Sequence, residues 1–182
     1  MVRKLKYHEQ KLLKKVDFIT WKKDDTQREN RILRKYHIQK REDYTKYNKL
    51  CGQVHSLATK IKELDAKDPF KGEATKKLLD KLKGMGLINE AEHLSNIDKV
   101  SASSFCRRRL PVVMVRLRMA EHIKDAVKYI EQGHVRVGPE LIMDPAFLVV
   151  RNMEDYVTWV DTSKIRKHVL EYNDMKDDFD VA

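Results

Sequence analysis

The sequence predicts an α+β protein: a mostly helical N-terminal region, then two short helices, a small sheet and a short C-terminal helix. Apolar residues recur every three or four positions as far as Gln132, a spacing typical of helices. After Gly133 the pattern changes to short β-rich segments, separated by the turn signals Gly138-Pro139 and Asp144-Pro145. Asp161-Thr-Ser163 then offers caps for a last helix.

In the N-terminal region we expect a helix from Leu5 to about Trp21, a polar link at 22–30, a short helical piece at Arg31–His37 and a long helix from Arg41 to Leu64. One face of the first helix is rich in lysine, and it is either solvated or laid against RNA or a partner. The long helix has an apolar seam that we interpret as core, cysteine and tyrosines included. The seam contains Tyr44, Tyr47, Cys51, Val54, Ala58 and Ile61, widened by Leu50, Leu57 and Leu64.

Further along, proline and glycine divide the chain into shorter elements. We expect a helix at Lys71–Met85, because Pro69 breaks the preceding helix and Gly84 and Gly86 end this one. A loop should follow at 88–99, and the serines at 101–104 can cap the next helical turn. The later elements are expected as helices at Leu110–Leu117 and Glu121–Gln132, strands at His134–Val137, Leu141–Ile142, Phe147–Val150 and Tyr156–Val160, and a last helix ending near Tyr172.

The net charge of +10 is polarised along the chain. Residues 1–50 carry a net +9, residues 51–100 a net +1, residues 101–150 a net +3 and residues 151–182 a net −3. Such a basic protein favours a polyanionic partner, nucleic acid first and an anionic membrane surface second. The acidic end is expected to be solvated or to contact a basic partner.

No catalytic or metal-binding pattern stands out. The seven histidines have no metal-ligand spacing, and there is no glycine-rich phosphate loop, nucleophile elbow or zinc-protease motif. His134 is expected to be packed or hydrogen-bonded, with RNA contact as the alternative. We therefore expect no enzyme, no cofactor and no metal.

The cysteines and the hydropathy of the sequence indicate in which cellular compartment the protein is found. Cys51 and Cys106 are isolated thiols, which suits a reducing environment. No apolar run approaches the roughly 18–20 residues that cross a bilayer, and the cationic N-terminus is not followed by the apolar stretch of a secretory signal. We expect an intracellular protein.

A basic helix pair is the most informative feature. Arg109 and Arg116 are seven positions apart, or about two helical turns, so we expect them to share a face. Lys124 and Lys128 are four apart on the next helix. If the two faces adjoin, they form a cationic platform suited to a phosphate backbone.

The segment 109–160 resembles the S4-like RNA-binding domain. The resemblance rests on the order and spacing of Arg109-Leu110, Arg116-Leu117, Ala126, Gly133-His134-Val135, Val137 and Asp144-Pro145. It departs at Ile123, where the family often has arginine, and at Gly138-Pro139, where it often has an Asn-Gly turn. Domain boundaries are expected at 1–106 (basic helical region), 107–172 (S4-like domain with the last helix) and 173–182 (acidic tail). The resemblance implies RNA-facing positions at Arg109, Arg116, Lys124, Lys128, His134 and Arg136, flanked by Arg107 and Arg108.

Over nearly its whole length the chain resembles the S4-related family of U3 small nucleolar ribonucleoprotein components. This resemblance rests also on the opening 3–18, on segments 39–43, 64–69 and 78–88, and on 152–161. It implies a nucleolar, non-enzymatic protein of the small-subunit processome that binds U3 RNA and helps it pair with the ribosomal RNA precursor for early cleavages. It also implies two protein partners, a Brix-domain protein and a large phosphorylated scaffold. The alternatives are a mature small-subunit ribosomal protein of the S4 family, from which a basic tail is expected, and the RNA-binding appendage of an enzyme such as a pseudouridine synthase, for which no length remains.

Overall fold

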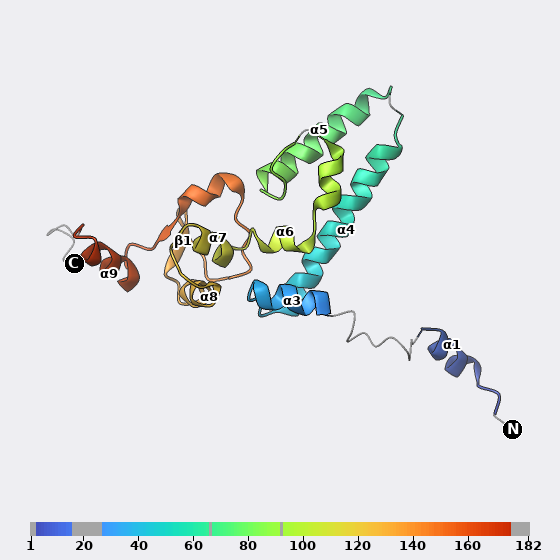
Figure 1. Ribbon diagram of the computed structural model, residues 1–182, viewed down its shortest axis with the longest axis horizontal. Coiled ribbons are helices and arrows are strands. Elements are labelled where there is room, and N and C mark those ends of the chain that lie inside the picture. Colours follow the sequence, from blue (N-terminus) through green and yellow to red (C-terminus); the bar gives the residue numbers. More distant parts are fainter. Residues whose placement is uncertain (1–2, 16–26, 66, 92, 176–182) are drawn as a thin grey trace. The chain divides into compact units, whose positions relative to one another are not determined.

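A long helix, α4 (Arg41–Glu63), carries the helical part of the fold and is shown in Figure 1. The computed structural model describes residues 3–15, 27–65, 67–91 and 93–175. The chain divides into two units, residues 1–35 and residues 36–182, and each is described by itself. The second unit holds α4 and every element that follows it.

The first unit contains α1 (Tyr7–Lys15) and α3 (Gln27–Lys35). A helix was expected from Leu5 to about Trp21; its second half lies outside the described residues. The polar link expected at 22–30 is wrong for residues 27–30, which are helical. Leu5 and Leu12 are 38% and 60% exposed. The described part of this unit therefore offers little core of its own.

The prediction of α4 is confirmed to within one residue at its C-terminal end. The seam is buried at Tyr44, Tyr47, Cys51, Ala58 and Ile61. The predicted widening of the seam is wrong, because Leu50 and Leu57 are 40% and 50% exposed. Three later elements pack on α4: α5 (Pro69–Gly84), η1 (Leu94–Lys99) and α6 (Ala102–Cys106).

Two short caps organise the segment after α4. In α5 (Pro69–Gly84), the Asp68 carboxylate accepts a hydrogen bond from the backbone N–H of Phe70 at 2.9 Å. The segment expected as a loop at 88–99 contains a 3-10 helix, η1 (Leu94–Lys99). The expected serine cap is present at α6 (Ala102–Cys106), where the Ser101 N–H donates to Ser104 Oγ at 3.4 Å.

The C-terminal half is an α+β module, as predicted. Two short helices, α7 and α8, pack on a three-stranded antiparallel sheet of order β2-β1-β3. In the register, Arg136 lies opposite Leu141 on one side and Thr158 on the other. The strand expected at Phe147–Val150 is only an isolated bridge between Leu148 and Arg109. The elements are α7 (Leu110–Arg116), α8 (Ile123–Glu131), β1 (Val135–Val137), β2 (Glu140–Leu141), η2 (Arg151–Tyr156), β3 (Val157–Trp159) and α9 (Lys164–Tyr172).

The β1–β2 turn explains the departure at Gly138-Pro139. Gly138 has a φ of +60°, a left-handed conformation that glycine adopts without steric cost. Pro139 then leads directly into β2, so the pair makes a two-residue hairpin connection. Gly138-Pro139 therefore serves as the connection between β1 and β2.

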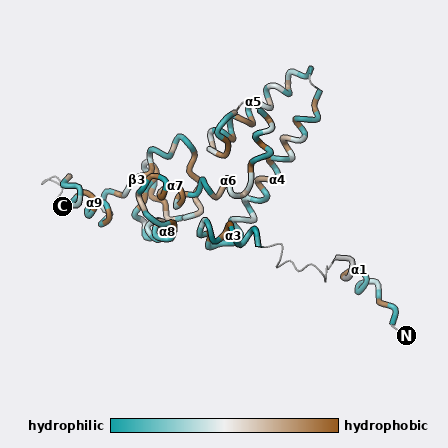
Figure 2. The backbone as a smooth tube through the Cα atoms, in the orientation of Figure 1, coloured by the Kyte–Doolittle hydropathy of each residue, from teal (hydrophilic) through white to brown (hydrophobic). Residues whose placement is uncertain are grey.

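The core of this module lies between the helix pair and the sheet. Figure 2 shows apolar segments at α7 and at β3, and hydrophilic segments along α8. Aliphatic side chains from the helices and from the sheet make up most of this core. Each such side chain stabilises the fold by about 1.5–3 kcal/mol when it is fully buried. The buried residues are Leu110, Val113, Met114, Ala126, Ile130, Val135, Val137, Val149 and Val157.

Tyr47 links the helical region to this module. The rings of Tyr47 on α4 and Phe105 on α6 stack with centroids 5.9 Å apart and planes 5° apart. The Tyr47 hydroxyl also donates a long hydrogen bond of 3.4 Å to the carbonyl of Ala146. Both tyrosines of α4 are therefore core residues, as predicted.

Candidate nucleic-acid interface

The three consecutive arginines at 107–109 lie in different environments. Arg107 is exposed, whereas the side chains of Arg108 and Arg109 are only 5% and 2% exposed. This corrects the prediction that Arg108 and Arg109 face RNA, because protein groups enclose both guanidinium groups. A buried guanidinium is tolerated only where partners compensate its charge.

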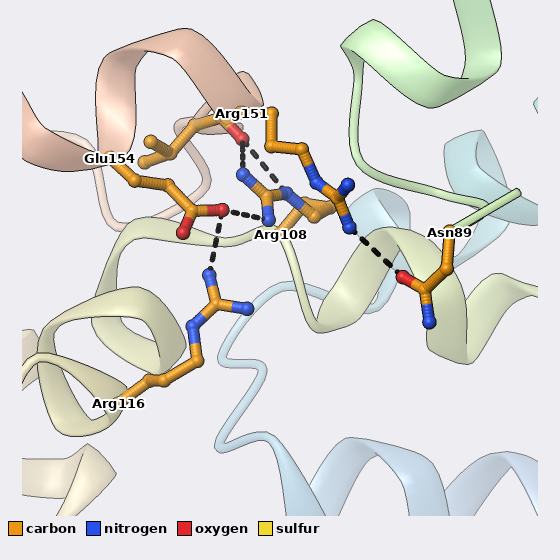
Figure 3. Close-up of polar contacts among 6 residues, drawn as sticks. Asn89, Arg108, Arg116, Arg151 and Glu154 are labelled. Carbon is orange, nitrogen blue, oxygen red and sulfur yellow. Dashed lines mark hydrogen bonds and ion pairs between the residues drawn. The ribbon is translucent and has the colours of Figure 1, made fainter.

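Arg108 connects three segments of the second unit. Figure 3 shows its contact with Glu154. Its Nε and Nη2 donate to the Val149 carbonyl at 2.9 and 2.6 Å, and its Nη1 donates to the Glu154 carboxylate. On the other side it lies against Gly86, where an added Cβ would be 2.8 Å from the Arg108 Cζ. Gly86 has a φ of +72°, so both its conformation and its contact with Arg108 require glycine. Arg108 thus holds the turn after α5 against η2.

Arg109 ties α4 to the S4-like module. Its Nη1 donates to Asp43 Oδ2 at 3.3 Å, while its Nε is buried without a partner among the described residues. Arg109 is also the residue before α7, with an extended backbone of φ −65° and ψ 142°. The prediction that it shares a helical face with Arg116 is therefore wrong: Leu110 begins the helix, and Arg109 lies outside its periodicity.

Glu154 is shared between a buried and an exposed arginine. Arg116 Nη2 lies 2.9 Å from the same carboxylate oxygen that Arg108 contacts, and the Arg116 side chain is 52% exposed. Burial alone would raise the pKa of the Glu154 carboxyl, but the hydrogen bond and charge of Arg108, followed by those of Arg116, lower it overall. Two cations on one carboxylate leave a positive excess, and Arg116 is the member that solvent reaches (Figure 3).

The lysines of α8, Lys124 and Lys128, are exposed. Lys124 has no ion pair with any residue that the structure describes, and Lys128 forms a weak pair with Asp125 at 3.5 Å. On the opposite face of the helix, Ala126, Val127 and Ile130 are buried. The two lysines lie one turn apart, so they form a cationic stripe on the solvent side of α8.

His134 and Arg136 are held by residues near the start of α9. His134 Nδ1 forms a hydrogen bond with Ser163 Oγ at 3.0 Å, in agreement with a hydrogen-bonded interpretation. Arg136 donates to Thr158 Oγ1 at 3.1 Å and to Asp161 Oδ2 at 2.8 Å. Asp161 also pairs with Arg166. Two cations therefore share the Asp161 carboxylate, and a positive excess remains beside Arg136.

The structure also exposes cations that the sequence analysis did not select. Arg118, in the turn after α7, has a φ of +59° and is exposed. Arg151, the first residue of η2, is exposed and its Nη2 donates to Asn89 Oδ1 at 2.9 Å. Lys99 ends η1. Nothing in the local sequence marks these positions, since each is brought to the surface by tertiary packing.

The comparisons with known proteins cover the whole chain. Residues 4–107 match the ribosomal protein S4/S9 N-terminal domain, and residues 108–155 match the S4 domain. The U3 small nucleolar ribonucleoprotein protein IMP3 of Saccharomyces cerevisiae is 60% identical over 183 residues, covering 100% of both chains. The Homo sapiens protein of that name is 57% identical over 182 residues, covering 100% of this chain and 99% of its own. This chain belongs to the IMP3 family.

This member of the IMP3 family is also similar to a small ribosomal subunit protein, at lower identity. The small ribosomal subunit protein uS4 of Caldivirga maquilingensis is 30% identical over 148 residues, covering 81% of each chain. Both resemblances expected from the sequence, to the S4 domain and to the U3-associated family, are confirmed. The predicted domain boundaries stay a prediction.

The described residues of this member of the IMP3 family contain no group of three or more His, Cys, Asp or Glu that could hold a metal ion. No helix among them is long and apolar enough to cross a membrane.

Proposed function

We propose that this protein is a non-enzymatic ribosome-assembly factor that binds U3 small nucleolar RNA. The observation that carries the proposal is the 60% identity, over the full length of both chains, to a protein named as a U3 small nucleolar ribonucleoprotein component. The exposed cations of the S4 domain provide a physical means of binding. In this role the chain acts in the small-subunit processome and in the nucleolus.

The RNA-contacting surface in this proposal is centred on Arg107, Arg116, Lys124 and Lys128, all of which are exposed. His134 and Arg136 lie at its margin, since their side chains are engaged with Ser163 and Asp161. Each cation that neutralises a phosphate releases condensed counterions, so affinity falls steeply with salt. A-form RNA is contacted through its backbone and shape, which fits a surface of long cationic side chains.

The proposed outcome of binding is faster pairing of U3 RNA with the ribosomal RNA precursor, before the early cleavages that lead to 18S RNA. Repulsion between two phosphate backbones opposes annealing, and bound cations reduce it over a Debye length of about 8–10 Å. The protein makes no covalent change in this step. Its proposed protein partners are a Brix-domain protein and a phosphorylated scaffold of the same U3 subcomplex.

The proposal is tested with a charge reversal of the α8 stripe, Lys124→Glu with Lys128→Glu. A fluorescent U3 fragment is titrated at several salt concentrations, and annealing to a precursor fragment is followed in parallel. We expect lower affinity and loss of annealing. The slope of log affinity against log salt concentration should decrease by the contribution of about two phosphate contacts. The matched control, Lys124→Arg with Lys128→Arg, keeps the charge and should keep all three properties. Unchanged binding and annealing in the charge-reversed protein would reject this surface.

Crosslinking in cells separates this role from that of a mature ribosomal protein. The crosslinked RNA is sequenced, and reads that map to U3 RNA and to the leader of the ribosomal RNA precursor support the proposal. Reads confined to mature ribosomal RNA favour the alternative, for which the 30% identity to uS4 is the basis.

A further inference from the structure

We infer that a polar pocket between the turn after α5, η1 and α6 holds one unpaired base of the bound RNA. This inference rests on the proposed RNA binding and adds a specific contact to it. The pocket has a volume of about 270 Å³. Its polar lining comes from Asn89, Glu90, Asn96, Lys99, Ser104 and Arg107.

The volume of the pocket allows a small ligand. It is slightly below the roughly 300–1,000 Å³ of cavities that drug-sized ligands fill, so it suits a fragment such as a single base. Ile88 and Val100 give it an apolar floor, at 7% and 3% exposure. A flat base has apolar faces and polar edges, which match a floor of this kind surrounded by polar walls.

The walls offer the groups that read base edges. Asn96 donates to the Glu90 carbonyl at the long distance of 3.4 Å, and its amide oxygen can accept a hydrogen bond. The Asn89 amide oxygen accepts from Arg151, which leaves its NH₂ group to donate. Unstacked RNA bases are recognised by hydrogen bonds of this kind.

The rim of the pocket is cationic. Lys99 and Arg107 are exposed, and neither has a carboxylate partner in the described part of the chain. The one hydrogen bond of the Arg107 guanidinium there goes to Ser104 Oγ at 3.2 Å. Arg151 adds a third cation next to Asn89, against the single carboxylate of Glu90. This excess of positive charge favours a phosphate-bearing ligand over a basic peptide.

The pocket continues the proposed RNA surface. Arg151, which bonds to its Asn89 wall, begins the same η2 helix that carries Glu154, the partner of Arg116 (Figure 3). Arg107 lines the pocket and also belongs to the proposed RNA surface. This shared cation favours RNA over a separate acidic peptide.

The walls are fixed before any ligand binds. Arg108 packs under Gly86, and the Leu87 N–H donates to the Leu82 carbonyl at 3.0 Å, so the turn leading to Asn89 is held. On the other side, the Val100 N–H donates to the Ile97 carbonyl at 2.9 Å. A preformed pocket loses little entropy on binding, which favours affinity.

The test compares two RNAs in titrations with the full-length protein: a duplex with one bulged nucleotide and the same duplex without the bulge. The wild-type protein should bind the bulged RNA about tenfold more tightly, the size of one good base contact. An abasic residue at the bulge should abolish that preference. Asn96→Leu, which fills the pocket, and Asn96→Ala, which only removes the amide, should both reduce the preference and leave binding to the plain duplex unchanged.

A crosslink in the wild-type protein gives an answer that does not depend on any variant. With 4-thiouridine at the bulge, the crosslinked peptide should come from residues 87–107. Equal binding of bulged, abasic and plain RNA, or crosslinks only on α8, would overturn the pocket while leaving the proposed function intact. If the protein bound none of the three RNAs, both the proposed function and the proposed binding of a base in the pocket would be rejected.

Discussion

Arg109 and Asp43 form a buried ion pair between the S4 domain and α4, with 3.3 Å between Nη1 and Oδ2. Their side chains are only 2% and 13% exposed, and 66 residues separate them in sequence. The charge of Arg109 would be uncompensated without this carboxylate. The contact therefore makes the packing of α4 a condition for burying an arginine of the RNA-binding module.

Replacing Asp43 with alanine should destabilise the protein by about 3–5 kcal/mol, because it leaves the buried Arg109 charge unpaired. Urea unfolding followed by circular dichroism measures the change. Asp98→Ala is the matched control: its pair with Lys62 has a similar distance of 2.9 Å but side chains 43% and 60% exposed, so it should cost less than about 1 kcal/mol. Equal losses in the two variants would contradict a structural role for the buried pair.

Gly86→Ala should also destabilise the protein, by about 1–3 kcal/mol. The left-handed backbone strains any residue with a Cβ, and this Cβ would meet the Arg108 guanidinium at 2.8–3.0 Å. Thermal unfolding should show a lower midpoint. In Gly52→Ala, within α4, nothing lies within 4 Å of the added Cβ, so this control should gain up to about 1 kcal/mol of stability. A neutral Gly86→Ala would mean that Arg108 does not depend on this turn.

The sequence was informative where local periodicity decides the structure. The spacing of Tyr44, Tyr47 and Cys51 predicts the buried side of α4, and Gly133 marks the change from helix to strand. It was misleading at Leu50 and Leu57, because an apolar side chain needs a neighbouring element to cover it. No such element packs on that side of α4 among the described residues.

The candidate site was predicted less well, and the arginines explain why. Arg107, Arg108 and Arg109 have the same chemistry, and only their partners separate an exposed cation from two buried ones. Those partners are Asp43 on α4 and Glu154 on η2, far from the arginines in the chain. Charge counting cannot detect such pairs. The pocket beside Arg107 was missed for the same reason, since its walls come from separate elements.

The pKa of Glu154 predicts a loss of stability in acid. Its folded-state pKa is lowered below the ordinary value of 4.5, so its contribution is fully present above that value and is lost as pH falls through the folded pKa. Unfolding free energies between about pH 5 and pH 3 should therefore fall more steeply for the wild type than for Glu154→Gln. Glu73→Gln removes an exposed carboxylate paired with Lys77 and should follow the wild type. Parallel curves for Glu154→Gln and the wild type would exclude this contribution.

Both thiols should be unreactive in the folded protein. Burial raises the pKa of the Cys51 thiol and raises that of Cys106 to about 11, although Arg109 partly offsets the latter. A thiol-specific reagent at about pH 8 should modify neither cysteine until denaturant is added, because the thiolate is the reactive form. Mass spectrometry of the intact protein counts the modified thiols. Rapid modification of Cys106 under native conditions would show that its site opens.

Arg108 and Arg116 share Glu154, but their mutations should affect different properties: RNA affinity for Arg116 and stability for Arg108. Arg116→Gln removes an exposed partner of a carboxylate that Arg108 still neutralises, so stability should change by less than about 1 kcal/mol. Its RNA affinity should nevertheless fall, with a salt dependence reduced by about one phosphate contact. Arg108→Gln should cost roughly 2–4 kcal/mol, because the Val149 carbonyl and Glu154 lose a buried partner. Under conditions where it remains folded, its RNA affinity and salt dependence should equal those of the wild type. A reduced salt dependence in folded Arg108→Gln would show that RNA reaches this arginine and that the buried network opens on binding.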